Sequence, residues 1–309
     1  MSFLVELPLD RYRADAMDPL KVVSEFRLDN ARSMMWMSQL AYETPHETPT
    51  ERKVSTILSR WHLRLVDCIN NPPGTNLPLQ TACAVIASGR GAMIVAFAGT
   101  DPLKIHDWIT DFSALPSANG AQTGFEVAVD QIWGRIAAAI ANRLPPDDAL
   151  FFTGHSLGGA LAIIAAARTQ RLLQLTPTAV YTFGSPRPGD QQFAAGFDLA
   201  VRGRIYRLVH GTDIVATVGP SQTGFRHVGH MLVCLSGAQF SSGPLLPNDN
   251  DKPDFVRSFF DSVLNTIRMS IAGPLFAPLG PGLFGQFLGI LPLQIRDHVP
   301  ANYFRALGQ

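Results

Sequence analysis

The spacing of hydrophobic positions changes along this chain. Apolar side chains recur at helical spacing near the N-terminus, and we expect residues 1–75 to form a helical N-terminal region. Short apolar runs follow, typical of strands buried on both faces. We expect these strands at residues 82–88, 92–98, 149–153, 178–184 and 204–210. Helical patterns separate most of them, at residues 121–142, 158–173 and 190–201.

The alternation of strands and helices predicts an α/β fold with a mostly parallel central sheet and helices on both faces. Gly89-Arg90-Gly91 joins the first two runs and predicts a hairpin between them. We find no repeat and no low-complexity linker, so residues 1–309 are expected to form a single domain. In such sheets, ligands bind at the loops that follow the carboxyl ends of the strands.

Composition narrows the class of protein. Hydrophobic residues make up 46% and charged residues 16% of the chain, which excludes a disordered protein. The 25 basic and 25 acidic residues cancel, which argues against a nucleic-acid partner. Cys68, Cys83 and Cys234 are too few and too scattered for a disulfide framework or a zinc site. No histidine and carboxylate cluster has metal-ligand spacing, so we expect no metal and no cofactor.

Two segments bear on location. The N-terminus lacks the unbroken apolar run of a Sec-type signal peptide, which predicts a cytoplasmic protein, with export only by a non-Sec route. Residues 269–295 carry no charge and are long enough to span a bilayer. Their prolines and glycines would interrupt a continuous helix. We therefore expect an apolar insertion, within residues 236–296, rather than a membrane anchor.

One motif points to chemistry. After the run at residues 149–153, the chain reads Gly154-His155-Ser156-Leu157-Gly158-Gly159 and then enters an alanine-rich helix. This is G-x-S-x-G between a strand and a helix, the context in which a serine nucleophile sits on a sharp turn. The glycines let neighbouring backbone pass close to Ser156. The N–H groups at the start of the helix would stabilise negative charge developing beside it.

Four blocks in this order are similar to the lipase class 3 group of α/β-hydrolases. They are Ala96-Phe97-Ala98-Gly99-Thr100-Asp101, Asp107-Trp108-Ile109-Thr110-Asp111, the Gly154 to Gly159 motif, and Phe183-Gly184-Ser185-Pro186-Arg187-Pro188-Gly189-Asp190. The resemblance implies an α/β-hydrolase fold and a Ser-Asp-His triad. It also implies an oxyanion hole made by Thr100 and Leu157, with Ser156 as the nucleophile.

The acid and the base follow the serine in the chain. Asp213 turns out of the end of the strand at residues 204–210, where a carboxylate can orient an imidazole. It also matches the family's catalytic aspartate. His298 resembles the family's terminal histidine, which precedes an aromatic residue. His227 and His230 are the alternatives for the base, and they precede an apolar run rather than follow one. His155 is interpreted as a packed residue of the elbow.

Two segments are candidates for substrate binding. Residues 102–112, with Trp108 and Ile109, match the amphipathic lid of the fungal lipases, or else form a fixed surface helix. Residues 273–295, with Phe284 and Phe287, could wall an acyl-chain pocket or contact a lipid surface. Plain core or a dimer contact is the alternative for this second segment. The sequence does not predict the oligomeric state.

These observations predict a serine carboxylic ester hydrolase, lipase-like, that cleaves triacylglycerol or related lipid esters through an acyl-enzyme. The substrate would be met at a lipid–water interface. The runner-up is a phospholipase or a non-lipid esterase, acting on aryl esters or polyesters, with the same triad. From other classes, we consider an acyl-binding protein without turnover and a membrane-anchored protein.

Overall fold

A mixed sheet forms the centre of the computed structural model, which describes residues 7–44, 50–70, 82–100, 118–197, 199–219, 224–242, 245 and 293–309. Within this described part, the sheet has seven strands in the order β1-β2-β3-β4-β5-β7-β9. The strands are β1 (Arg64–Ile69), β2 (Ala84–Gly89), β3 (Ala92–Phe97), β4 (Ala149–His155), β5 (Ala179–Phe183), β7 (Ile205–His210) and β9 (His230–Cys234). A separate ribbon pairs β6 (Gly189–Asp190) with β8 (Phe225–Arg226).

The sheet is antiparallel at one edge and parallel elsewhere. β1 pairs with β2, and β2 with β3, in antiparallel fashion, while β3, β4, β5, β7 and β9 run parallel to one another. Gly89 faces Ala92 across the β2–β3 turn, which confirms the predicted hairpin. The carboxyl ends of the parallel strands therefore gather along one edge, where an active site is expected.

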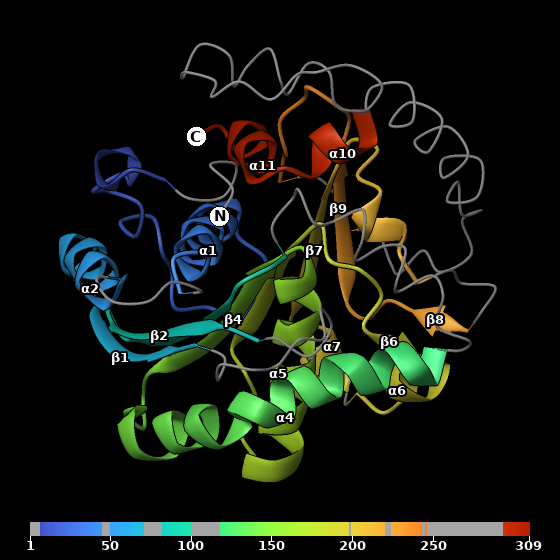
Figure 1. The fold of residues 1–309 in the computed structure, drawn as a ribbon, viewed down its shortest axis with the longest axis horizontal. Coiled ribbons are helices and arrows are strands. Elements are labelled where there is room, and N and C mark those ends of the chain that lie inside the picture. The colour runs from blue at the N-terminus through green and yellow to red at the C-terminus, as the bar shows by residue number, and fades with distance from the viewer. Residues whose placement is uncertain are drawn as a thin grey trace, which may run out of the picture.

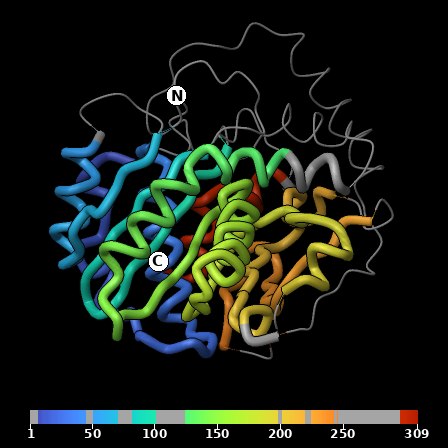
Figure 2. The backbone as a smooth tube through the Cα atoms, turned by 90° about the horizontal axis from the view of Figure 1, so that it is seen from below, coloured from blue at the N-terminus to red at the C-terminus, as the bar shows by residue number. Residues whose placement is uncertain are grey.

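Helices cover both faces of the sheet (Figure 1). On one face lie α1 (Leu28–Ala41), α2 (Thr50–Arg60), α10 (Leu293–His298) and α11 (Pro300–Ala306). The opposite face carries α4 (Ala118–Arg143) and α5 (Leu157–Leu173), which cross in front of the sheet in Figure 2. Shorter elements are α6 (Gln191–Ala195), α7 (Leu199–Arg202) and the 3-10 helices η1 (Leu9–Arg11) and η3 (Val215–Thr217).

Strand β3 shows how the two faces divide the core. Its Met93, Val95 and Phe97 pack with the helices α4 and α5, whereas Ala92, Ile94 and Ala96 pack with α1. All six side chains are fully buried. A strand buried on both faces reads as an unbroken apolar run, which is why the sequence shows no alternation here.

Two sequence expectations need correction. Residues 64–69, within the region expected to be helical, form the edge strand β1, whose pairing with β2 supplies backbone hydrogen bonds that the local pattern does not reveal. The single helix expected at residues 190–201 is two short helices, α6 and α7. Asp190 caps the first of these, because its carboxylate accepts a hydrogen bond from the N–H of Phe193.

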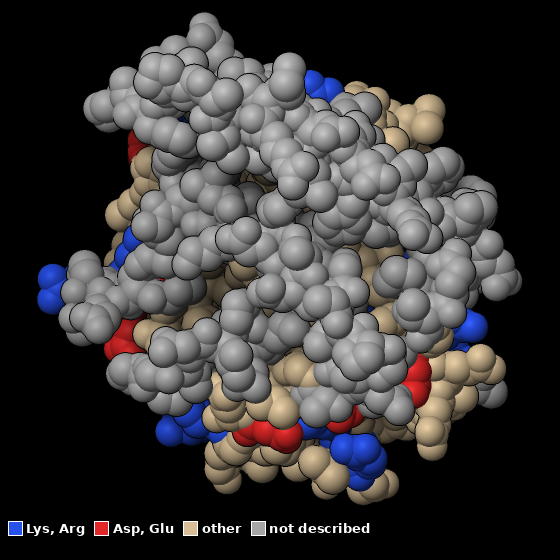
Figure 3. Space-filling model, turned by 45° about the vertical axis from the view of Figure 1, so that its right-hand side comes forward, with Lys and Arg blue, Asp and Glu red and all other residues tan. Residues whose placement is uncertain are grey.

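Other expectations concern the surface and the membrane. Lys and Arg side chains are interspersed with Asp and Glu along the rim of the described residues in Figure 3, in keeping with the balanced composition. Among the helices that the structure describes, none is both long and apolar enough to cross a membrane. Most of the apolar segment 269–295 lies outside the described residues, and the single-domain organisation stays a prediction.

A matched pair of glycines tests the packing of α5 on the sheet. A Cβ at Gly158 would lie 2.4 Å from the carbonyl oxygen of Phe97 in β3, whereas a Cβ at Gly134 in α4 meets nothing within 4 Å. We expect Gly158→Ala to lower the free energy of unfolding by about 1–3 kcal/mol. Gly134→Ala should raise it by about 1 kcal/mol, since alanine is the better helix former. Denaturant unfolding measures both, and equal effects of the two substitutions would contradict this packing.

Candidate active site

Ser156 lies on a strained turn between β4 and α5. Its backbone angles are φ 60° and ψ −135°, a region that side-chain-bearing residues rarely adopt. A Cβ at Gly154 would lie 2.2 Å from the carbonyl carbon of Gly158, so only glycine fits there. The N–H of Ser156 donates to the carbonyl oxygen of Phe183 in β5 at 2.9 Å. The sharp turn predicted from G-x-S-x-G is therefore present.

Asp213 and His298 meet beside this turn. The imidazole Nδ1 of His298 lies 2.8 Å from Oδ1 and 2.9 Å from Oδ2 of Asp213. Both side chains are completely buried. A Cβ on Gly184, which follows β5, would touch both groups, at 2.3 Å from Asp213 Oδ2 and 2.9 Å from His298 Nδ1. The loops after β5 and β7 and the end of α10 thus converge at one point.

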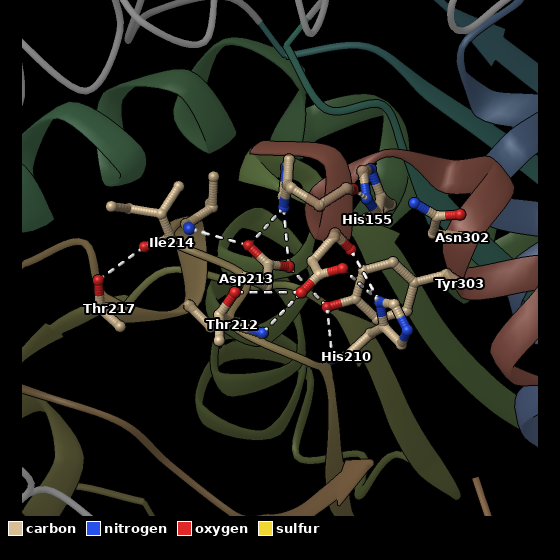
Figure 4. Close-up of polar contacts among 12 residues, drawn as sticks. His155, His210, Thr212, Asp213, Ile214, Thr217, Asn302 and Tyr303 are labelled. Atoms are coloured by element: carbon tan, nitrogen blue, oxygen red, sulfur yellow. Dashed lines mark hydrogen bonds and ion pairs between the residues drawn. The ribbon is translucent and has the colours of Figure 1, made fainter. Parts of the chain in front are cut away.

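The carboxylate of Asp213 has further hydrogen bonds. The hydroxyl of Tyr303 in α11 donates to Oδ2 at 2.6 Å, and the N–H of Val215 donates to Oδ1 at 2.9 Å (Figure 4). Burial and the neighbouring Asp213 charge raise the pKa of Tyr303 well above its usual value, so its hydroxyl keeps its proton and remains a donor. Such bonds stabilise the ionised form of a buried carboxylate.

His155 packs against His298 instead of facing solvent. The two rings stack with centroids 4.6 Å apart, and Nε2 of His155 lies 2.7 Å from the backbone carbonyl oxygen of His298. A carbonyl oxygen only accepts, so Nε2 carries the proton. Nδ1 is then the acceptor for the Tyr42 hydroxyl at 2.7 Å. Burial, and then the charge of His298, lower the pKa of His155 well below its ordinary value. This ring is neutral.

Two buried atoms at the centre of the site have no partner. Among the residues that the structure describes, neither Ser156 Oγ nor His298 Nε2 makes a hydrogen bond. The bond between a serine nucleophile and its base is often long before substrate binds. Every other polar atom of His298 and Asp213 discussed above is satisfied, so these two atoms are the ones left for chemistry.

The alternative histidines lie elsewhere. Nε2 of the buried His227 lies 2.9 Å from the carbonyl oxygen of Ala216, and His230 stacks on Tyr206 with ring centroids 6.2 Å apart. Asp213 pairs with His298 and with neither of these histidines in the described contacts. Of the three candidates for the base, only His298 has the expected acid partner.

Leu157 follows Ser156 directly in the chain, and Thr100 follows Gly99, which approaches the serine turn. Leu157 is the first residue of α5, and Thr100 is half-buried after the end of β3. A Cβ at Gly99, beside Thr100, would lie 2.9 Å from Cβ of Ser156, so this loop passes directly over the nucleophile turn. Their role in binding an oxyanion stays a prediction.

The structure does not describe the predicted substrate-binding residues, and it adds three residues to the site that the sequence did not predict. Trp108, Ile109, Phe284, Phe287 and the candidate lid at 102–112 lie outside the described residues. No group of His, Cys, Asp or Glu in the described ranges could hold a metal ion. Sequence reasoning missed Tyr42, Asp297 and Tyr303. Asp297 and Tyr303 are close to His298 in the chain, which was the available signal, whereas nothing in the sequence marks Tyr42.

The sheet order, the nucleophile turn and the buried acid and histidine define an α/β-hydrolase fold. Residues 94–223 match the family model described as lipase (class 3), which confirms the resemblance carried by the four motifs. The structure is similar to that of a mono- and diacylglycerol lipase from Aspergillus oryzae, with a TM-score of 0.58 and 17% identity, over 76% of this chain and 91% of that one.

Two fungal proteins are similar in sequence. Secreted mono- and diacylglycerol lipase 1 of Fusarium solani is 35% identical over 148 residues, 45% of this chain and 43% of that protein. Secreted mono- and diacylglycerol lipase 3 of Gibberella zeae is 27% identical over 224 residues, 63% of this chain and 70% of that protein. The chain thus spans less than half the length of the Fusarium protein.

The expectation of a cytoplasmic location is wrong in the light of these relatives, since both are named as secreted. It rested on the lack of an apolar N-terminal run, which is not a physical requirement for the place where an α/β-hydrolase works.

Two buried neutral histidines predict a loss of stability in acid. Burial is the largest cause that lowers the pKa of His155 and His227 well below 6.5, whereas the unfolded chain takes up these protons near that value. The unfolded state therefore binds more protons below about pH 6.5, and each histidine adds about 1.4 kcal/mol per pH unit to the fall in the free energy of unfolding.

The measurement is denaturant unfolding between pH 7 and pH 5 for wild type, His227→Gln and the control His62→Gln, at an exposed histidine. The slope should decrease more in the His227 variant, whose amide can still donate to Ala216, than in the exposed control. An unchanged slope in His227→Gln would contradict the lowered pKa of His227 in the folded state.

Proposed function

We propose that this chain is a serine carboxylic ester hydrolase that acts on acylglycerols. The observation that carries the proposal is the buried pair of Asp213 and His298 beside the strained turn of Ser156. Strain of this kind costs about 1–3 kcal/mol and persists where the surrounding structure enforces it, often at active sites. A buried nucleophile, base and acid of this order support acyl transfer.

The first half-reaction forms an acyl-enzyme. Asp213 accepts from Nδ1 of His298, which leaves the lone pair on Nε2 available as the base. Ser156 Oγ attacks the ester carbonyl carbon while its proton moves to His298 Nε2. The imidazolium is stabilised by the carboxylate, and the neutral His155 ring stacked on it adds no opposing charge.

The N–H groups of Thr100 and Leu157 are proposed to stabilise the tetrahedral oxyanion in both half-reactions, helped by the N-terminus of α5. The first half-reaction ends when His298 gives its proton to the leaving alcohol oxygen as the bond between that oxygen and the acyl carbon breaks. In the second half-reaction, His298 accepts a proton from the water that attacks the acyl carbon. It then gives this proton to Ser156 Oγ as the bond between Oγ and the acyl carbon breaks, which frees the carboxylic acid and restores Ser156.

The relatives support acylglycerols as the substrate class. The Fusarium, Gibberella and Aspergillus proteins are named mono- and diacylglycerol lipases. We extend this substrate class to the present chain as a proposal, because the sequence matches cover only parts of the chains. A phospholipase or a non-lipid esterase would use the same three residues and is distinguished by substrate alone.

Ser156→Ala tests the nucleophile. We expect hydrolysis of monoacylglycerol and diacylglycerol to fall by at least about 10³-fold in this variant, because the triad acts as a unit. The matched control is Ser59→Ala on the exposed face of α2, which should retain full activity. Fatty acid release from emulsified acylglycerols gives the rates, and far-ultraviolet circular dichroism verifies the fold.

The same assay separates the alternatives. Faster turnover of phospholipids or p-nitrophenyl acetate than of acylglycerols would contradict the proposed substrate class. Full activity in Ser156→Ala would contradict the nucleophile. A wild-type protein that binds esters but releases no p-nitrophenol would indicate an acyl-binding protein without turnover.

A further inference from the structure

A second buried acid and histidine lie next to the first pair. Asp297 precedes His298 in α10, and His210 ends β7, three residues before Asp213. Nδ1 of His210 is 3.7 Å from Oδ1 of Asp297 and 3.2 Å from its backbone carbonyl oxygen (Figure 4). The end of β7 and the turn after it supply His210 and Asp213, whereas α10 supplies Asp297 and His298. Each acid therefore contacts the histidine of the other segment.

The carboxylate of Asp297 holds two loops. Its Oδ2 accepts hydrogen bonds from the N–H of Thr212 at 2.8 Å, the Thr212 hydroxyl at 3.1 Å and the Ser236 hydroxyl at 2.5 Å. Thr212 belongs to the turn that presents Asp213, and Ser236 follows β9. Asp297 is only 2% exposed, and buried carboxylates are retained when donors satisfy them in this way.

The turn is shaped to admit this carboxylate. Gly211 has φ +57°, and a Cβ there would lie 2.2 Å from Asp297 Oδ2. The His210 ring is fixed as well, since its Nε2 accepts from the N–H of Gly237 at 3.4 Å, which leaves the proton on Nδ1 facing Asp297. In an asparagine at position 297, an NH₂ group replaces one of the two carboxylate oxygens. Either the side of Thr212 and Ser236 or the side of His210 would then face a donor instead of an acceptor.

We propose that Asp297 is a positioning residue that fixes the separation and orientation of His298 and Asp213. This inference rests on the proposed function. Asp297 is bonded by the chain to His298 and by hydrogen bonds to Thr212, the neighbour of Asp213, so it spans the acid–base pair from both ends. It contacts neither reacting atom and acts only through the two residues that it holds.

Asp297→Asn is the first test. We expect kcat for acylglycerol or p-nitrophenyl ester hydrolysis to fall by about 10–100-fold, with KM within about twofold of wild type, because a small misplacement of a catalytic group lowers the rate of the chemical step. The matched control is Asp15→Asn, at an exposed acid on the N-terminal segment, which should keep wild-type constants. The fraction of reactive Ser156, titrated with a p-nitrophenyl phosphonate, corrects kcat for inactive protein.

Proton NMR supplies a readout that does not depend on turnover. The proton shared by His298 Nδ1 and Asp213 is expected to give a low-field resonance in wild type and in Asp15→Asn, and this resonance should shift or broaden in Asp297→Asn. A folded Asp297→Asn with wild-type kcat per titrated serine and an unchanged resonance would overturn the proposal.

Ser236→Ala is the graded variant if the asparagine protein does not fold. It removes one of the three donors to Asp297, and we expect a fall in kcat of about 3–10-fold with the resonance shifted in the same direction. Wild-type kcat together with an unmoved resonance in this variant would also overturn the proposal. A wild type that hydrolyses no ester contradicts the proposed function, whereas the resonance still tests the role of Asp297.

Discussion

The contact between His298 and Asp213 joins residues 85 positions apart in a place without access to water. A carboxylate buried in this way is costly unless hydrogen bonds replace its water. The replacements come from three parts of the fold: the imidazole at the end of α10, the hydroxyl of Tyr303 in α11, and the N–H of Val215 in η3. Because each donor belongs to a different element, the carboxylate is satisfied only when the C-terminal helices have docked beside the end of β7. The burial of this one charge thus ties the completion of the fold to the assembly of the site.

The nucleophile turn depends on the same docking. Ser156 holds a strained backbone, and its neighbour His155 places a neutral ring under His298. The Nε2–H of His155 donates a hydrogen bond to the backbone carbonyl oxygen of His298. The hydroxyl of Tyr42, which follows α1, donates one to Nδ1 of His155. Helix α1 and the C-terminal helices therefore contact the elbow from one side, while α5 begins on the other. In the described part of the chain, Ser156 Oγ and His298 Nε2 are the two atoms of the elbow and its acid–base pair without a partner.

The sequence predicted those parts of the molecule that are local. Consecutive residues determine the strand–turn–helix context of Ser156 and the hairpin at Gly89-Arg90-Gly91. The same holds for the apolar runs of the parallel strands. Asp213 was predicted from its position after a strand, and His298 from its resemblance to a family block, with His227 and His230 left open. Their geometry could not be decided locally, because it depends on which histidine the C-terminal segment brings to β7. The edge strand β1 was missed since its stability comes from pairing with β2, and Asp297 since its donors, Thr212 and Ser236, lie far away in sequence.

Two buried carboxylates are each costly unless hydrogen bonds replace the water that they lose. Here each has its own set of donors: Tyr303 and Val215 bond to Asp213, and Thr212 and Ser236 bond to Asp297. Each acid pairs with the histidine of the other segment, so a displacement of α10 relative to the end of β7 breaks both pairs at once. In a single acid–histidine pair, the two groups could keep their distance while the imidazole rotated about the line that joins them. Two pairs in opposite directions, with Gly211 admitting the second acid, fix the rotation as well, which is the condition for directing His298 Nε2 at one serine rather than merely near it.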